Sequence, residues 1–191
     1  MYLQQIDQLT PMIDELTGRV ETLMAPFLPA RDLLVTIPGV NILVADVIIA
    51  ETGADMQRFP TAGHLASWAG VTPGHHQSAK VVKSAKTRPG DRYLKAALGT
   101  AALTITRTRG NYLSALYKRL ASRRGPSKAI VAVEHSILIS VWHMLTRNQP
   151  YQDLGSDHFT KLKPEQIARR AVRQLEQLGF RVTLTPNEAA A

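Results

Sequence analysis

The chain has 191 residues, of which 45% are hydrophobic and 20% charged, an ordinary globular composition that can build one sizeable core or two small ones. Its net charge of +8 favours a polyanionic partner, and its lack of cysteine excludes disulfides and thiolate zinc sites. The first ten residues, MYLQQIDQLT, contain neither a basic head nor an apolar run, so we expect no signal peptide and a cytoplasmic protein.

Residues 6–23 carry apolar side chains at alternating intervals of three and four, which predicts an amphipathic helix within a first unit of residues 1–28. Pro11 interrupts the pattern, and Thr10 could cap a helix that starts at this proline. The spacing is also a heptad seam. Two interpretations stay open, a helix packed on its own domain and one arm of a coiled coil. The seam residues are Ile6, Leu9, Ile13, Leu16, Val20 and Leu23.

The next segment, residues 33–53, reads LLVTIPGVNILVADVIIAETG and predicts two helices joined by a Pro-Gly turn. We expect the second helix over Ile42–Glu51, with Gly53 as its C-terminal cap and with Asp46 and Glu51 on solvated faces. The pattern is similar to a helix-hairpin-helix element, whose turn offers backbone N–H groups to a DNA phosphate.

Within that turn, Asn41 stands where the helix-hairpin-helix pattern has a second glycine, and asparagine tolerates a left-handed backbone. The turn residues Gly39, Val40 and Asn41 are therefore candidate DNA contacts. The alternative is a helical hairpin that serves only for packing.

Further along, Pro60 or Thr61 is expected to open a short helix that ends at Trp68, which we place in the core. A segment without periodicity, residues 74–92, follows, with a short strand pair near residues 79–82. A loop this long in a compact domain is typically functional or disordered. It contains Ser78, and Ser84 is a second candidate hydroxyl.

The remaining periodic segments predict helices at 92–106, 112–123, 128–146 and 164–179, with Ser127 capping the third. The apolar run 129–145 contains Glu134 and is expected to be too short and too polar to cross a membrane. The fold class is mainly α. We expect a helical domain over 31–151, containing the hairpin, and a basic helical tail over 152–191.

Positive charge is concentrated between residues 79 and 128, which hold thirteen basic residues and one acid, Asp91, so that this segment carries +12. Phosphoryl transfer depends on positioning and on neutralising charge at phosphorus, and a serine hydroxyl needs help to act as a nucleophile. The cations near Ser78 could supply that help or could form a DNA-binding loop without catalysis. They are Lys80, Lys83, Lys86, Arg88 and Arg92.

Four stretches in this order resemble a known family: IPGVNILVADVIIAETG, FPTAGHLASWAGVTP, the Ser78 loop with GDRYLKAAL, and VWHMLTRNQPY. Together they cover roughly residues 31–151. They resemble the C-terminal transposase domain of bridge-RNA-guided insertion-sequence transposases, which use a serine and a DEDD acidic site and are relatives of DNA invertases. The first helix resembles the end of the coiled-coil connector of that family.

The resemblance implies that Ser78 is the nucleophile, because it falls five residues after Pro73 of the Gly-Val-Thr-Pro segment, where the family has its serine. It also implies an N-terminal RNase H-like domain with four acidic residues that bind magnesium, a guide RNA, and a covalent phosphoserine link to DNA.

We therefore expect this chain to be a C-terminal piece or a truncated relic of a DNA recombinase, inactive alone and associated with the bacterial nucleoid. It holds no metal site of its own, and it forms a homo-oligomer through the coiled coil. The alternatives are a non-catalytic nucleic-acid-binding module and a helical oligomerisation piece.

Overall fold

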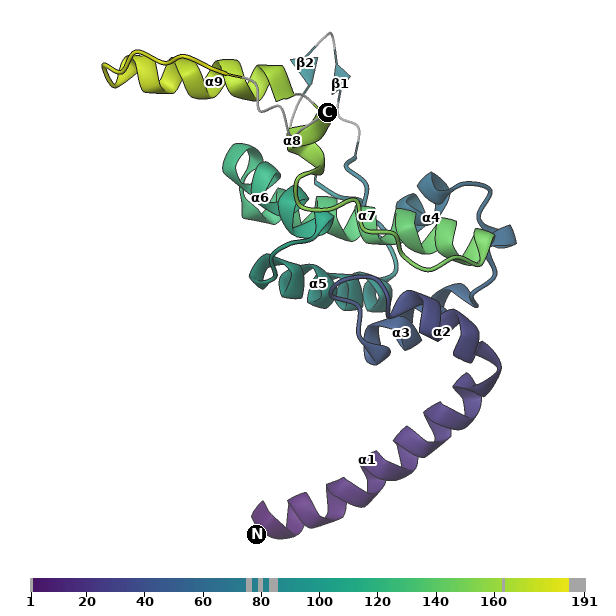
Figure 1. Cartoon of the computed structure of the whole chain (residues 1–191). Helices are drawn as coiled ribbons and strands as arrows, with labels where there is room; N and C mark the ends of the chain where they lie inside the picture. The colour runs from purple at the N-terminus through teal and green to yellow at the C-terminus, as the bar shows by residue number, and fades with distance from the viewer. Residues whose placement is uncertain (1, 75–76, 79–80, 83–85, 163, 186–191) are drawn as a thin grey trace.

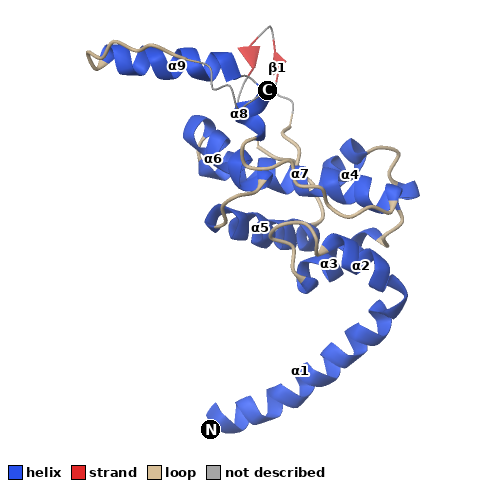
Figure 2. Ribbon diagram, viewed as in Figure 1, coloured by secondary structure: helices blue, strands red, loops and turns tan. Residues whose placement is uncertain are grey.

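The computed structural model of the protein describes residues 2–74, 77–78, 81–82, 86–162 and 164–185. Over these ranges the protein is mainly helical, which confirms the predicted class, and the helices surround a single core (Figures 1 and 2). The elements are α1 (Tyr2–Met24), η1 (Ala25–Phe27), α2 (Leu28–Leu34), α3 (Ile42–Thr52), η2 (Met56–Arg58), α4 (Ala62–Trp68), β1 (Gln77–Ser78), β2 (Val81–Val82), α5 (Arg92–Arg107), α6 (Tyr112–Arg124), α7 (Pro126–Arg147), α8 (His158–Leu162) and α9 (Pro164–Gln177).

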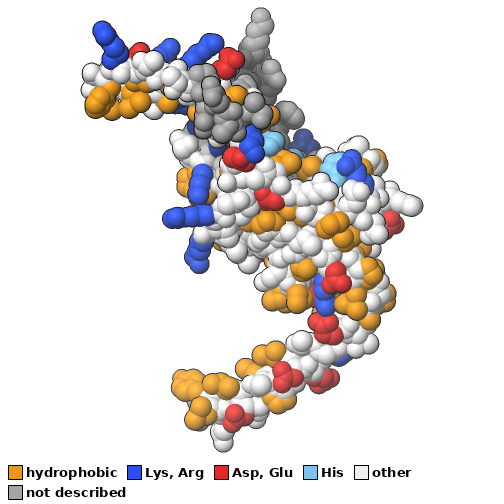
Figure 3. Space-filling view, viewed as in Figure 1, with side chains coloured by type: hydrophobic (Ala, Val, Ile, Leu, Met, Phe, Trp, Pro, Cys, Tyr) orange, Lys and Arg blue, Asp and Glu red, His pale blue; other side chains and the backbone are white. Residues whose placement is uncertain are grey.

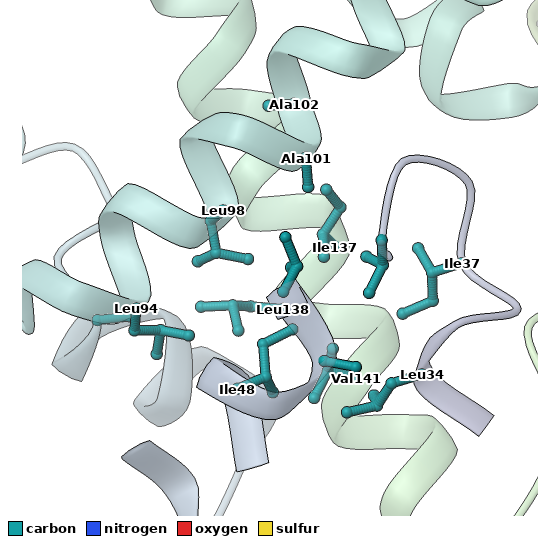
Figure 4. Close-up of a cluster of buried hydrophobic side chains, with 14 of the residues drawn as sticks. Leu34, Ile37, Ile48, Leu94, Leu98, Ala101, Ala102, Ile137, Leu138 and Val141 are labelled. Atoms are coloured by element: carbon teal, nitrogen blue, oxygen red, sulfur yellow. The ribbon is translucent and has the colours of Figure 1, made fainter. Parts of the chain in front are cut away.

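Helix α7 is the centre of the core, and α2, α4, α5 and α6 all pack against it. Its inward face is fully buried at Val133, Ile137, Leu138 and Val141. Figure 4 shows side chains of α5 and of the α2–α3 region converging on this face. The core therefore holds the helices on both sides of the Ser78 loop, α4 and α5, against one common support.

The expectation that the apolar run of α7 is too short to cross a membrane was wrong. The helix has 22 residues and contains a window of mean hydropathy 1.5. By length and composition alone, such a helix could cross a membrane. Burial in the core accounts for its apolar face, because four other helices pack around it and Ala129 and Val133 have no exposed surface.

Helix α1 runs without a break through Pro11, so the predicted start at this proline was wrong. Thr10 is inside the helix, where its hydroxyl donates to the carbonyl oxygen of Ile6 at 2.9 Å instead of capping. The helix projects away from the core (Figure 1), and Met24 is its one buried residue among those described. All six seam residues are exposed, so this helix does not pack its apolar face on its own domain. The coiled coil stays a prediction.

The junction of the first three helices is held by Arg31 of α2, whose side chain is 8% exposed. Its Nε donates to Asp46 Oδ1 of α3 at 2.7 Å, and its Nη1 donates to Glu21 Oε2 of α1 at 2.9 Å. The expectation that Asp46 is solvated was therefore wrong, because its side chain is 13% exposed and lies in this ion pair.

Two other local expectations were wrong. Helix α7 begins at Pro126 after Gly125, whose φ is 87°, so Ser127 lies inside the helix and is not its cap. Trp68, the last residue of α4, was expected in the core but is 42% exposed. The centroid of its ring lies 5.4 Å from that of Phe59. The predicted start of α4 is confirmed, because Thr61 accepts a hydrogen bond from the backbone of His64.

Candidate nucleic-acid interface

The backbone of Ser78 lies in a two-stranded antiparallel ribbon. Gln77 of β1 is opposite Val82 of β2, and Ser78 is opposite Val81. Ser78 is thus next to the connection between the strands. The side chain of Ser78 lies outside the described part of the structure. The same is true of four residues near it in the sequence, Ala79, Lys80, Lys83 and Ser84.

The base of this ribbon is tied together by backbone and side-chain contacts. The amide of Gly74 donates to the carbonyl oxygen of Lys86 at 3.1 Å, and Pro73 forms a bridge with Thr87. From α5, Lys95 Nζ donates to Thr87 Oγ1 at 3.0 Å and to the carbonyl oxygen of Gly70 at 3.2 Å. One cation therefore joins both ends of the Ser78 loop to helix α5.

The Gly90-Asp91-Arg92-Tyr93-Leu94 turn has a structural role at each of three positions. A Cβ at Gly90 would lie 2.4 Å from the amide nitrogen of Gly70, so the two ends of the loop approach closely only because this residue is glycine. Asp91 caps α5 by accepting from the amide of Leu94 at 2.7 Å, and the Leu94 side chain is fully buried. The turn thus fixes where the loop ends and α5 begins.

Three of the five cations predicted to surround Ser78 are among the described residues. Lys86, Arg88 and Arg92 all have exposed side chains at the end of the loop. Arg92 donates to the hydroxyl of Tyr93 at 2.7 Å and lies 4.6 Å above its ring centroid, which restricts where its guanidinium can point. These side chains keep their charge available to a solvent-borne anion.

The second predicted contact, the turn between α2 and α3, packs against α5. Gly39 has φ 85°, and a Cβ there would lie 2.7 Å from the carbonyl oxygen of Ala101. Val40 is 6% exposed, and its amide donates to the carbonyl oxygen of Ile37. Asn41 is exposed and caps α3 by accepting from the amide of Val44 at 2.9 Å.

The amides of this turn that remain available to an anion are those of the first turn of α3. The amides of Ile42 and Leu43 have no intrahelical acceptor at that position, and their side chains are 54% and 73% exposed. A phosphate bound there would meet the positive end of α3. The prediction of DNA contact at Gly39, Val40 and Asn41 stays a prediction.

Helix α5 joins the two candidate regions. It starts at the end of the Ser78 loop, and the α2–α3 turn packs on Ala101, ten residues after Asp91. At 1.5 Å per residue, the two regions are separated by about 15 Å along this helix. Because α5 is packed on the core, their relative position is fixed by a regular element.

Sequence reasoning missed the buried carboxylate that faces Lys95. Glu134 of α7 is 5% exposed, and among the described contacts its Oε2 has no hydrogen-bond partner. Burial raises the pKa of Glu134, and the nearby charge of Lys95 acts in the opposite direction. An acid inside an otherwise apolar run was the available signal, but its partner could not be read from the sequence.

In the described part of the chain, no three His, Asp or Glu side chains gather in a way that could hold a metal ion. The described residues therefore do not fit a magnesium site.

Comparison with known proteins identifies the domain built around α2 to α6. The sequence model of the transposase family IS116/IS110/IS902 matches residues 31–118. Residues 31–118 are similar in sequence to the transposases of this family. The match includes the α2–α3 turn, the Ser78 loop and α5, and it ends within α6. The family resemblance expected over residues 31–151 is thus confirmed for this shorter range.

Curated relatives contain similar sequence. A candidate transposase of Sinorhizobium fredii, y4pF/y4sB, is 32% identical over 124 residues, which are 62% of this chain and 32% of that protein. The pilin gene-inverting protein of Moraxella bovis is 30% identical over 122 residues, 62% of this chain and 38% of that protein. The transposase for insertion sequence element IS1111A of Coxiella burnetii is 30% identical over 121 residues, 61% of this chain and 33% of that protein. The similar segment thus makes up about a third of each of these curated relatives.

Proposed function

We propose that the transposase domain binds DNA and carries, in Ser78, the nucleophile of a recombinase that cuts and joins DNA strands. The helix-hairpin-helix turn between α2 and α3 would bind the DNA backbone beside the reacting strand. The observation that carries the proposal is the Ser78 ribbon, tied at its base to α5 by Lys95 and followed by exposed Lys86, Arg88 and Arg92. Its setting in a transposase-family domain supports the reaction class.

In the proposed reaction the Ser78 hydroxyl attacks the phosphorus of a DNA phosphodiester. The new Oγ–P bond replaces one P–O bond to deoxyribose, and a phosphoserine link results. The hydroxyl gives up its proton as the bond forms, and the departing deoxyribose oxygen takes up a proton to become a hydroxyl. Attack by a hydroxyl of a second strand reverses these steps and joins DNA, so the total number of ester bonds is conserved.

The cations at the loop end would neutralise charge that develops on the non-bridging oxygens during this exchange. Among the described cations at the loop end, Arg92 has the most restricted side chain, because its guanidinium hydrogen bonds to the Tyr93 hydroxyl and lies over the Tyr93 ring. The remaining requirement is an activating group for the hydroxyl. We propose that it comes from an RNase H-like acidic domain with bound magnesium, acting together with a guide RNA.

Assembly and location belong to the same proposal. The exposed seam of α1 would pair with a second copy as a coiled coil, so that two Ser78 loops serve two strands. The complex would act at the bacterial nucleoid in the cytoplasm. The names of two relatives, a transposase for an insertion element and a pilin gene-inverting protein, support DNA as the substrate of such an assembly.

The test has two parts. The chain alone is titrated with duplex DNA at several salt concentrations, and neutralising about six phosphates should give a log–log slope near −5. With the acidic domain and guide RNA added, Ser78→Ala should abolish the covalent DNA adduct seen on a denaturing gel, whereas Ser84→Ala should spare it.

These two readouts separate the parts of the proposal. A flat salt response rejects DNA binding altogether. A steep salt response with an adduct that survives Ser78→Ala rejects the catalytic assignment and leaves a DNA-binding module without this nucleophile.

A further inference from the structure

Helix α6 and the end of α5 lie in a stretch of the chain that contains no acidic residue. Between Asp91 and Glu134 the sequence has nine basic residues and no aspartate or glutamate. Six of these basic residues have exposed side chains on α6 or at its connection to α5. We call them the α6 patch: Arg107, Arg109, Lys118, Arg119, Arg123 and Arg124.

The α6 patch projects from one edge of the molecule. Figure 3 shows Lys and Arg side chains standing out from the edge formed by α6 and the end of α5. On α6, Lys118, Arg119 and Arg123 fall within about 140° of the helix circumference at 100° per residue, so they share one face. A linear polyanion lying along that face could meet several of them at once.

The charge of the α6 patch is not neutralised within the described part of the chain. The ion pairs found there join Arg31, Lys161 and Arg169 to their acids, and none involves the α6 patch. The acid that contacts α6 in the described structure is Asp153, which accepts a hydrogen bond from the amide of Tyr112 at the start of the helix. Asp153 therefore lies at the N-terminal end of α6, whereas Arg123 lies at the C-terminal end.

Helix dipoles explain only part of this pattern. Arg107, Arg123 and Arg124 lie in the last turns of α5 and α6, where a cation is stabilised by the helix C-terminus. Arg109 follows α5 and Lys118 is inside α6, so the dipole gives no reason for their charge. Both side chains are exposed to solvent, so their charge is available to a bound anion.

The surroundings of Arg119 favour contact with a phosphate backbone over contact with bases. Its guanidinium lies 4.6 Å above the ring of Phe159, which fixes it on the surface of α6. The neighbouring aromatic rings of Tyr112 and Phe159 stack on each other with centroids 5.3 Å apart, so one face of each ring is already covered. The patch thus offers oriented charge without an open stacking surface.

We infer that the α6 patch is a second contact surface for a nucleic-acid backbone, at the opposite end of α5 from the Ser78 loop. Arg107 lies at the other end of α5 from Arg92, about 22 Å along the helix axis at 1.5 Å per residue. The inference rests on the proposed function, since it assigns a further part of the same bound nucleic acid. Its chemistry is that of phosphodiesters, which DNA and RNA share.

The experiment uses the whole chain and compares two triple variants that remove the same charge. One carries Lys118→Gln, Arg123→Gln and Arg124→Gln and keeps Arg119, which packs on Phe159. The control carries Arg169→Gln, Arg170→Gln and Arg173→Gln on the exposed tail helix α9. Each is titrated with a duplex DNA and with an RNA hairpin over a range of salt concentrations, after circular dichroism shows wild-type helicity.

Loss of three phosphate contacts should reduce the magnitude of the log–log slope by about 2 to 3 on the polymer that the α6 patch binds. The control variant should keep a slope close to that of the wild type. Loss on DNA alone or on RNA alone supports the inference and names the source of the phosphates.

Two results overturn the inference while leaving the proposed function standing. One is a wild-type slope in the α6 variant on both polymers, and the other is an equal loss in the α9 control, which would reflect net charge alone. A wild-type chain that binds neither polymer rejects the proposed function and this inference together.

Discussion

At the scale of single residues, the helical domain depends on a few side chains that act on the backbone of the Ser78 loop. Gly90 lets the loop ends meet, Asp91 starts the next helix, and Lys95 hydrogen bonds to both sides of the junction. Behind Lys95, the buried carboxyl of Glu134 has one oxygen without a described partner. In the reaction proposed above, the nucleophile must be held in place, so these residues would affect activity although none is proposed to touch DNA.

The burial of Glu134 predicts a pH-dependent stability. Its pKa is raised above the ordinary value of 4.5 because burial disfavours the carboxylate. The protonated carboxyl therefore contributes fully to the free energy of unfolding below about pH 4.5, and this contribution is lost as the pH rises through the raised pKa. Glu134→Gln should therefore unfold like the wild type at pH 4 and gain on the order of 1 kcal/mol in free energy of unfolding at pH 7.

Urea denaturation of both proteins at pH 4, 5.5 and 7 measures this difference. Glu165→Gln removes the same charge from an 80% exposed side chain and should show no such trend. A variant that is less stable than the wild type at pH 7 would mean that attraction between Glu134 and Lys95 outweighs the cost of burial.

At the scale of elements, most helices could be predicted from apolar periodicity and capping residues. The predicted start of α5 at Arg92 and the predicted Gly53 cap of α3 are confirmed, because a side-chain acceptor and a left-handed glycine act locally. Some errors arose locally, as at Pro11 and Ser127, and others arose where a distant partner decides. Asp46 is paired with Arg31, fifteen positions away in the sequence, and Lys95 reaches Gly70 twenty-five positions away. No local pattern records such contacts, so the anchoring of the candidate site could not be derived beforehand.

The contact between α5 and the base of the Ser78 ribbon predicts a second measurable effect. Lys95→Met keeps the aliphatic stem but removes the hydrogen bonds to Gly70 and Thr87, each of which involves a charged donor. Losing on the order of 1.5 kcal/mol from this junction should make local opening about tenfold more frequent. Trypsin should then cleave after Lys86 about tenfold faster, while the thermal unfolding midpoint changes little.

Mass spectrometry of a digestion time course locates and times this cut. Lys118→Met, on the exposed face of α6, is the matched control and should leave the rates unchanged. Equal cleavage rates in the Lys95 variant and the wild type would show that the backbone bridge at Pro73 and Thr87 holds the loop by itself.

At the scale of the whole molecule, a helical core carries two helices that project from it, α1 and α9 (Figure 1). Both expose apolar side chains, among them Ile13 and Leu16 of α1 and Leu175 of α9. Large exposed apolar stripes on a soluble domain usually mark surfaces that bind another protein. On α1 the stripe follows a heptad pattern, which is the pattern that a second helix of the same kind can cover.

The last prediction follows from this stripe. If α1 pairs with a second copy, the chain should sediment at equilibrium with a mass above the 21.0 kDa of one copy, in a concentration-dependent way. Ile13→Glu combined with Val20→Glu puts charge in the middle of the seam and should return the mass to that of one copy, because a buried unpaired carboxylate opposes pairing. Gln4→Glu lies on the opposite side of the helix and should leave association intact. If the wild-type chain stays at the mass of one copy at every concentration, its α1 seam does not pair with itself.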